Sequence, residues 1–186
     1  ICIDSLNNVY VTGAFMGPTD FGKGNITSLG SYDVFIAKYS SSGACQWVNR
    51  IGGTASDTAA SICVDSTGNL YITGIFSGTV NFGDGDVTSN GSKDAFIVKY
   101  DNDGIFQNVI TIGGSGDDSG SSVCIDSLNN LYVSGSYTGT VNFGGSDATS
   151  NGGTDAFLIK YSSTGDYDSL KTFGGVEDDI GQSACI

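Results

Sequence analysis

The chain has 186 residues, 39% of them hydrophobic, with 29 glycines, one proline and a formal net charge of −13. Seven basic residues and no histidine leave no Lys/Arg footprint for a phosphate backbone, so we expect neither nucleic-acid binding nor attraction to anionic membranes. No apolar run approaches the ~18 residues that a membrane helix needs, which predicts no membrane insertion.

From its first residue onward, the sequence repeats at a constant spacing without gaps. The segments ICIDSLNNVYVTG, ICVDSTGNLYITG and VCIDSLNNLYVSG begin at Ile1, Ile62 and Val123, and DVFIAKY, DAFIVKY and DAFLIKY follow at the same spacing. A third motif, IGGTASD, IGGSGDD and FGGVEDD, completes each copy. The period predicts three tandem units, 1–61, 62–122 and 123–183, with residues 184–186 opening a fourth innermost strand.

The middle unit predicts four strands, which in chain order are 61–65, 70–76, 94–100 and 106–112. The turn DSTGN follows the first strand, and the Asn90-Gly91 pair predicts a tight hairpin leading into the third. Strands such as NLYITGIF and DAFIVKY are apolar on both alternating faces, which is typical of a sheet covered on both sides. We therefore expect an all-β fold, a β-propeller segment of three four-stranded antiparallel blades, with essentially no helix.

These motifs resemble a bacterial family, the seven-bladed β-propeller (SBBP) repeat, whose signature runs Asp-x-x-Gly-Asn-x-Tyr-Val-Thr-Gly, Asp-Ala-Phe-x-x-Lys and a Gly-Gly before an acidic turn. DSTGNLYITG, DAFIVKY and IGGSGDD match it in order, and the resemblance covers all three units. The chain departs from the family in having DFG or NFG for a frequent Asp-Phe-Pro, and Asn7 and Asn129 where Gly68 stands. The resemblance implies a secreted or surface-displayed bacterial protein, generally without assigned enzymatic activity, and supplies no catalytic residues.

One acidic segment resembles a calcium site. Residues 113–121, GGSGDDSGS, fit a single Gly-Gly-x-Gly-x-Asp nonapeptide of calcium-binding β-rolls, which need consecutive copies. Here the equivalents lie in the other two units and lose the second half, which favours a structural role in which the recurring aspartate accepts backbone hydrogen bonds between blades. That aspartate is Asp57, Asp118 and Asp179. No cofactor is predicted beyond weak calcium binding, for which the candidate ligands are Asp117, Asp118, Glu177, Asp178 and Asp179.

Catalysis finds little support in the sequence. A propeller glycosidase needs two carboxylates in different environments, whereas the acidic positions here recur in every unit. The chain has no histidine to act as a base and no Gly-x-Ser-x-Gly elbow, so a serine nucleophile is not expected. One lysine recurs in the third strand of each unit, as Lys38, Lys99 and Lys160, and we predict a repeated Lys–Asp pair there.

Three functions fit these features. The leading one is a non-enzymatic extracellular propeller used for adhesion, surface display or binding of a protein or glycan partner. The alternatives are a structural unit of a surface fibre or sheath, and part of a carbohydrate-active propeller enzyme whose asymmetric residues lie outside this stretch. Propellers close with about four to eight blades, so three blades predict two unpaired apolar end faces, which further blades or another copy of the chain would cover.

Overall fold

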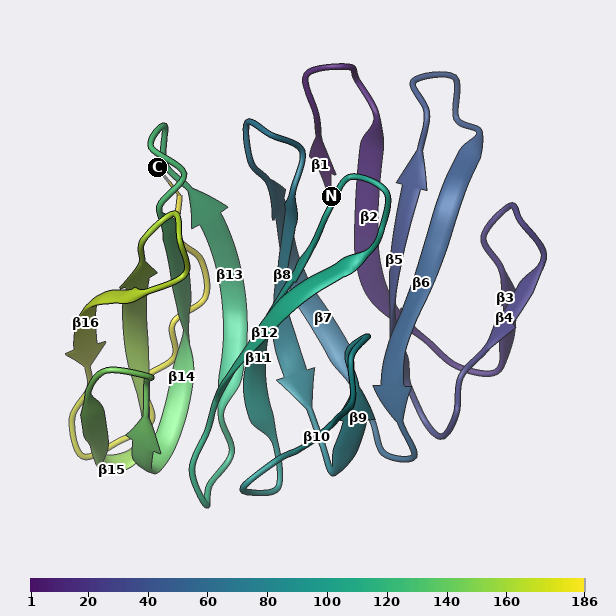
Figure 1. The fold of residues 1–186 in the computed structure, drawn as a ribbon. Helices are drawn as coiled ribbons and strands as arrows, with labels where there is room; N and C mark the ends of the chain where they lie inside the picture. Colours follow the sequence, from purple (N-terminus) through teal and green to yellow (C-terminus); the bar gives the residue numbers. More distant parts are fainter. Residues whose placement is uncertain (186) are drawn as a thin grey trace.

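A computed structural model describes residues 1–185 and shows an all-β molecule in which these residues contain sixteen strands and no helix. Three antiparallel blades lie side by side in chain order (Figure 1). Within residues 1–185, therefore, no helix exists that could cross a membrane.

Each blade is a four-stranded meander, and a hairpin from the second unit extends the sheet of the first blade to six strands. The first blade comprises β1 (Cys2–Ile3), β2 (Val9–Phe15), β5 (Asp33–Tyr39) and β6 (Cys45–Gly53). The second comprises β7 (Thr58–Val64), β8 (Leu70–Phe76), β11 (Asp94–Tyr100) and β12 (Phe106–Ile112). The third comprises β13 (Ser119–Ile125), β14 (Leu131–Asn142), β15 (Asp147–Tyr161) and β16 (Tyr167–Phe173).

The bounds of the middle blade follow the sequence closely, because three of its four strands begin and end where the pattern placed them. The first strand, β7, starts earlier, at Thr58, so the repeat limit at 61/62 falls inside a strand and the chain changes sheet at 54–57 instead. Of the predicted fourth strand, Ala184 and Cys185 are not in a strand. The Ala184 carbonyl accepts a hydrogen bond of 3.3 Å from Ser122 on β13, and Ile186 lies outside the described residues.

The long connection inside each unit holds a hairpin that the sequence did not predict. In the second unit it is β9 (Thr79–Asn81) and β10 (Asp86–Thr88), and in the first it is β3 (Pro18–Asp20) and β4 (Asn25–Thr27). In the third unit the hairpin continues β14 and β15. The second-unit hairpin reaches back to the first blade, because β9 pairs with the end of β6.

The hairpin predicted at Asn90-Gly91 is wrong. The chain reverses at residues 82–85, between β9 and β10. The amides of Asn90 and Gly91 instead donate to the carboxylate of Asp94, at 2.9 and 3.3 Å. Asn90 and Gly91 therefore place two backbone amides against the Asp94 carboxylate and do not form a hairpin turn.

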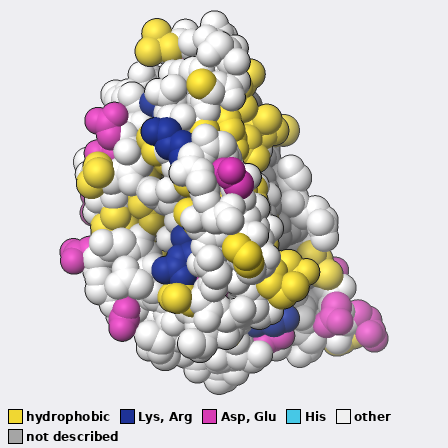
Figure 2. Space-filling model, turned by 90° about the vertical axis from the view of Figure 1, so that its right-hand side faces the viewer, with side chains coloured by type: hydrophobic (Ala, Val, Ile, Leu, Met, Phe, Trp, Pro, Cys, Tyr) yellow, Lys and Arg dark blue, Asp and Glu magenta, His cyan; other side chains and the backbone are white. Residues whose placement is uncertain are grey.

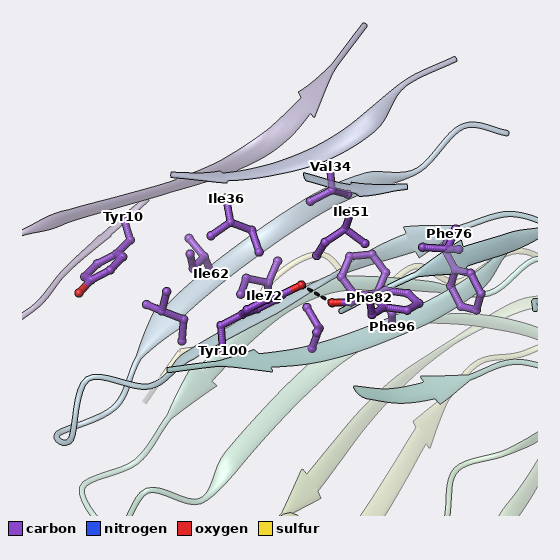
Figure 3. Close-up of a cluster of buried hydrophobic side chains, with 13 residues drawn as sticks. Tyr10, Val34, Ile36, Ile51, Ile62, Ile72, Phe76, Phe82, Phe96 and Tyr100 are labelled. Atoms are coloured by element: carbon purple, nitrogen blue, oxygen red, sulfur yellow. Dashed lines mark hydrogen bonds between the residues drawn. The ribbon is translucent and has the colours of Figure 1, made fainter. Parts of the chain in front are cut away.

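The hydrophobic core lies between the blades and has the period of the sequence. Between the first and second blades, Tyr10 and Ile36 pack with Ile72, Phe96 and Tyr100, all at most 4% exposed (Figure 3). The cluster between the second and third blades holds the residues at the equivalent positions one unit later: Tyr71, Ile97, Val133, Phe157 and Tyr161. Each strand is apolar on both faces because each blade packs against a neighbour.

The outer flanks carry the same residues without a neighbour. Phe35 and Tyr39 are half-buried on the first blade, where their equivalents Phe96 and Tyr100 are buried in the second. On the third blade Phe173 is 56% exposed, whereas its equivalent Ile112 is fully buried. Figure 2 looks onto the first-blade side and shows hydrophobic side chains in several groups, with lysine or arginine side chains among them.

Close packing explains the Thr-Gly or Ser-Gly pair in the second strand of every blade. Gly74 lies opposite Phe96 on the neighbouring strand, and a Cβ at Gly74 would lie 3.0 Å from the phenyl ring and 2.0 Å from the Thr58 carbonyl oxygen. Gly13 lies opposite Phe35 in the same way, but the three atoms nearest to its Cβ would all belong to that ring, with no backbone atom closer. A Cβ at the glycine of this motif therefore has less space in the second blade than in the first.

We expect Gly74→Ala to lower the free energy of unfolding by about 3 kcal/mol, because the methyl group forces a packed backbone apart. The matched control is Gly13→Ala, which should cost less than about 1 kcal/mol because only a side chain has to move. Urea denaturation of both variants provides the measurement. Equal losses at the two positions would contradict the packing described here.

Candidate functional site

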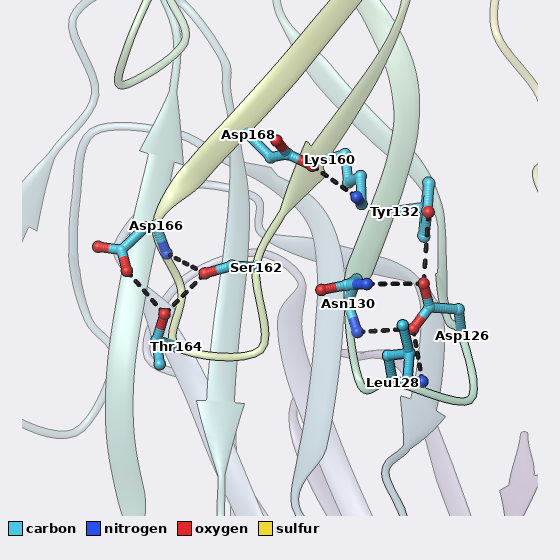
Figure 4. Close-up of polar contacts among 9 residues, drawn as sticks. All are labelled: Asp126, Leu128, Asn130, Tyr132, Lys160, Ser162, Thr164, Asp166 and Asp168. Carbon is cyan, nitrogen blue, oxygen red and sulfur yellow. Dashed lines mark hydrogen bonds and ion pairs between the residues drawn. The ribbon is translucent and has the colours of Figure 1, made fainter.

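In each unit, an aspartate in the turn between the first and second strands accepts several hydrogen bonds, and Figure 4 shows this turn in the third unit. In the third unit the Asp126 carboxylate accepts the amides of Leu128 and Asn130 at 2.8 and 2.9 Å, the Asn130 side-chain amide at 2.8 Å and the Tyr132 hydroxyl at 3.4 Å. Asp4 and Asp65 repeat this pattern.

These hydrogen bonds lower the pKa of the turn aspartate. Burial alone would raise the pKa of Asp65, but hydrogen bonds from Thr67 and Asn69 outweigh it and lower the pKa. The side-chain amide of Asn130 is the main cause that lowers the pKa of Asp126. Because the folded pKa lies below the unfolded value of about 3.9, the turns stabilise the fold above that pH, and the contribution is lost as the pH falls through the folded pKa.

A second recurring aspartate begins the third strand of the first two blades and lies inside that strand in the third blade. Asp33, Asp94 and Asp155 are at most 1% exposed, and each accepts an amide from the loop before it. The first glycine of the Gly-Gly pair makes room for this carboxylate, since a Cβ at Gly113 would lie 2.2 Å from Cγ of Asp94. The Gly-Gly motif is thus required by a buried carboxylate.

The third recurring aspartate ties consecutive blades together. Asp118 accepts the amide of Gly114, which follows β12 of the second blade, at 2.8 Å, and that of Thr138 in the third blade at 3.0 Å. Asp57 makes the equivalent bonds to Gly53 and Ser77, both at 2.9 Å, and Asp179 accepts the amide of Gly175. The predicted backbone-bonding role is confirmed. Burial raises the pKa of Asp57 and of Asp118 despite these bonds.

The structure does not bring the five candidate calcium ligands together. Both carboxylate oxygens of Asp118 already accept backbone amides, and Asp117 beside it is exposed. Asp178 and Asp179 accept the amides of Thr154 and Gly175, and Glu177 is exposed. Within residues 1–185 no three acidic or cysteine side chains are grouped so that they could hold a metal ion. Weak calcium binding stays a prediction.

The repeated Lys–Asp pair is wrong as a repeated feature. Of the three recurring lysines, all within the described residues, only Lys160 has a carboxylate partner, Asp168, at 2.5 Å (Figure 4). What recurs is a tyrosine ring, because Lys38, Lys99 and Lys160 each lie directly opposite a tyrosine on the neighbouring strand. The ammonium groups lie 5.2–5.8 Å from the ring centroids, within the range of a cation–π contact.

A groove of about 640 Å³ opens on the outer side between the first two blades and is our candidate functional site. We call it the outer groove. Leu29 and Ile105, 60% and 61% exposed, lie on its wall, and Arg50 lines it while forming an ion pair of 3.3 Å with the buried Asp33. The Asn49 side chain joins the blades across it by donating to the Gly104 carbonyl at 2.6 Å.

Sequence reasoning missed the outer groove because it followed the residues that recur. Several groove residues do not recur: Leu29 is asparagine in both other units, and Arg50 is threonine in both. Ile105 corresponds to Ala44 and Asp166. A search for positions that depart from the repeat would have found them.

We expect Asp118→Ala to lower the free energy of unfolding by about 2–4 kcal/mol, because it leaves two backbone amides without an acceptor. Asp117→Ala, on the neighbouring exposed residue, should change it by less than about 0.5 kcal/mol. Thermal and urea denaturation, with and without calcium, give both values. A loss for Asp118→Ala that appears only in calcium would contradict the backbone-tying role and point to a metal site.

Two comparisons relate the chain to known proteins. Residues 46–74, from β6 into β8, match the model of the SBBP β-propeller repeat. The chain is also 34% identical over 166 residues to an uncharacterized WD repeat-containing protein of Acanthamoeba polyphaga mimivirus, an alignment that covers 77% of this chain and 12% of that protein. The chain therefore carries an SBBP β-propeller repeat at residues 46–74, within a fold of three four-stranded blades that repeat the same motifs in order.

Proposed function

We propose that the chain is a non-enzymatic β-propeller segment of a secreted or surface-displayed protein and that it binds a protein or glycan partner in adhesion or display. The observation that carries this proposal is the outer groove. It combines exposed apolar side chains with a guanidinium, several amides and aromatic residues, and arginine and aromatic residues are enriched in interfaces.

The role of the acidic residues supports a binding function over catalysis. The recurring aspartates are engaged in holding backbone amides, as Asp118 holds those of Gly114 and Thr138. A carboxylate with this duty in every blade is a poor general acid or nucleophile, because moving it breaks a blade junction. The acids therefore serve the fold, and the surface between the blades serves the partner.

A second candidate role, assembly with further blades, is supported by the two flanks. Val11 on the first blade corresponds to Ile72, and Leu158 on the third corresponds to Ile97, and the two equivalents are buried at internal blade interfaces. Val11 and Leu158 are only half-buried. The outer flanks of the first and third blades thus carry the two surfaces that pack together at each internal blade interface. A blade of another copy, or a further blade of the same protein, would fit either flank. Repeated copies joined in this way would form a ring or a fibre.

The double substitution Leu29→Asn/Ile105→Asp tests the outer groove. It should leave the fold intact, because both residues already occur at the equivalent positions of the third unit. We expect the wild-type chain to bind at least one member of a panel of extracellular glycans and matrix proteins, and the double variant to bind it at least about tenfold more weakly, which corresponds to about 1.4 kcal/mol. Surface plasmon resonance measures both affinities.

The control is Asn90→Leu, which places the same apolar residue at the equivalent position of the next unit and should leave this affinity unchanged. Wild-type affinity in the double variant would show that the outer groove is not the binding surface. Turnover of chromogenic glycosides by the wild-type chain would contradict the non-enzymatic assignment.

A further inference from the structure

A row of three side chains crosses the same face of every blade. Its centre is the recurring lysine, with the tyrosine opposite it on the second strand and one residue opposite it on the fourth. In the second blade the row is Tyr71, Lys99 and Asn108. The first blade has Trp47 in place of Asn108, and the third has Ser169. The tyrosine and the lysine repeat, but the residue on the fourth strand does not.

In the first blade the row is completed by the chain itself. The Trp47 ring lies over Gly104 in the turn of the next blade, where a Cβ would be 3.0 Å from the indole, and its Nε1 donates to the Asn102 carbonyl at 3.2 Å. Lys38 donates to the same carbonyl at 3.0 Å and to the Asn102 side-chain oxygen. Its ammonium is therefore covered by a flat ring and neutral oxygen acceptors, and Lys38 is only 8% exposed.

In the second blade both of those partners are absent. Asn108 stands where Trp47 would be, and Ser163 in the turn of the third blade stands where Asn102 would be. Within residues 1–185 the Lys99 ammonium makes no hydrogen bond or ion pair, and its one polar contact is with the Tyr71 ring. A pocket of about 260 Å³ opens beside Lys99. Its lining includes Tyr71, Lys99, Asn108, Ser163, Ile97 and Leu131.

We propose that this pocket binds a small molecule consisting of a flat apolar ring that carries a carboxylate. The first interface supplies the template, because there an indole ring and oxygen acceptors fill the equivalent space against Lys38. In the second interface Ile97 and Leu131 offer the apolar wall for the ring. Lys99, the one basic side chain in the lining, offers the counter-ion for the carboxylate.

The size and the rim of the pocket fit the same ligand. Its volume of about 260 Å³ lies just below the range of about 300–1,000 Å³ typical of drug-sized ligands, which suits one or two fused rings rather than a chain of sugars. Ser162, Ser163 and Thr164 bring hydroxyl groups to one side, and Ser162 and Thr164 are held by a mutual hydrogen bond of 2.7 Å. This small-molecule site shares only Gln107 with the lining of the outer groove and does not depend on the proposed adhesion role.

Isothermal titration with three probes tests the proposal on the whole chain. Indole-3-acetate has the ring and the carboxylate, indole-3-methanol has the ring alone, and glucuronate has a carboxylate on a non-planar sugar ring. We expect indole-3-acetate to bind with a Kd of about 1 mM, the affinity of an efficient ligand of its size. The other two should bind at least about tenfold more weakly.

Two variants place this binding in the pocket. Lys99→Gln should weaken indole-3-acetate at least about tenfold, whereas Lys160→Gln, at the equivalent lysine outside the pocket, should leave it unchanged. Asn108→Trp/Ser163→Asn rebuilds the first interface and should abolish binding while giving the circular dichroism spectrum of the folded wild type.

Three results would overturn the proposal. One is no binding of indole-3-acetate up to 10-fold above the expected Kd of about 1 mM. Another is binding that survives both Lys99→Gln and the rebuilt interface. Tighter binding of glucuronate than of indole-3-acetate would reject the flat ring and assign the pocket to sugar acids.

Discussion

Each blade of this protein is apolar on both faces, and each face is buried only when another blade packs against it. Phe96 and Ile97 are neighbours in β11, yet Phe96 packs toward the first blade and Ile97 toward the third. A sheet of this kind cannot be stable alone in water, because one side of it would expose a continuous hydrophobic surface. The sequence repeat follows from this requirement, since every blade must present the same two surfaces to its neighbours.

The recurring polar residues make that stacking specific. Buried aspartates hold the backbone where it passes between blades, and glycines leave room for their carboxylates, as Gly113 does for Asp94. The family signature is therefore used almost entirely by the fold. Residues that depart from the repeat line spaces between blades: Arg50 and Ile105 in the outer groove, and Asn108 beside the recurring Lys99.

Much of the fold could be predicted from the sequence, because alternating apolar residues and turn residues mark β8, β11 and β12 to their ends. The β9–β10 hairpin was missed because its strands are only three residues long and the stronger turn signal, at Asn90, serves the Asp94 carboxylate instead. The predicted Lys–Asp pair was wrong because the strand register places a tyrosine ring, and not an aspartate, directly opposite the lysine. The sequence marks positions such as Arg50 and Asn108 that depart from the repeat, but it does not show that they line a groove and a pocket, since each of these spaces is formed by residues of two blades.

The central claim is that the two flanks are complementary halves of one blade interface. Sedimentation velocity on the wild-type chain, on Val11→Asp and on Leu158→Asp tests it directly. The account predicts that the wild type associates through a head-to-tail contact, and that each variant alone is monomeric because one flank carries a buried charge. An equimolar mixture of the two variants should recover a dimer, because it retains one intact copy of each flank. A wild-type chain that stays monomeric at all concentrations, or variants that associate as well as the wild type, would contradict it.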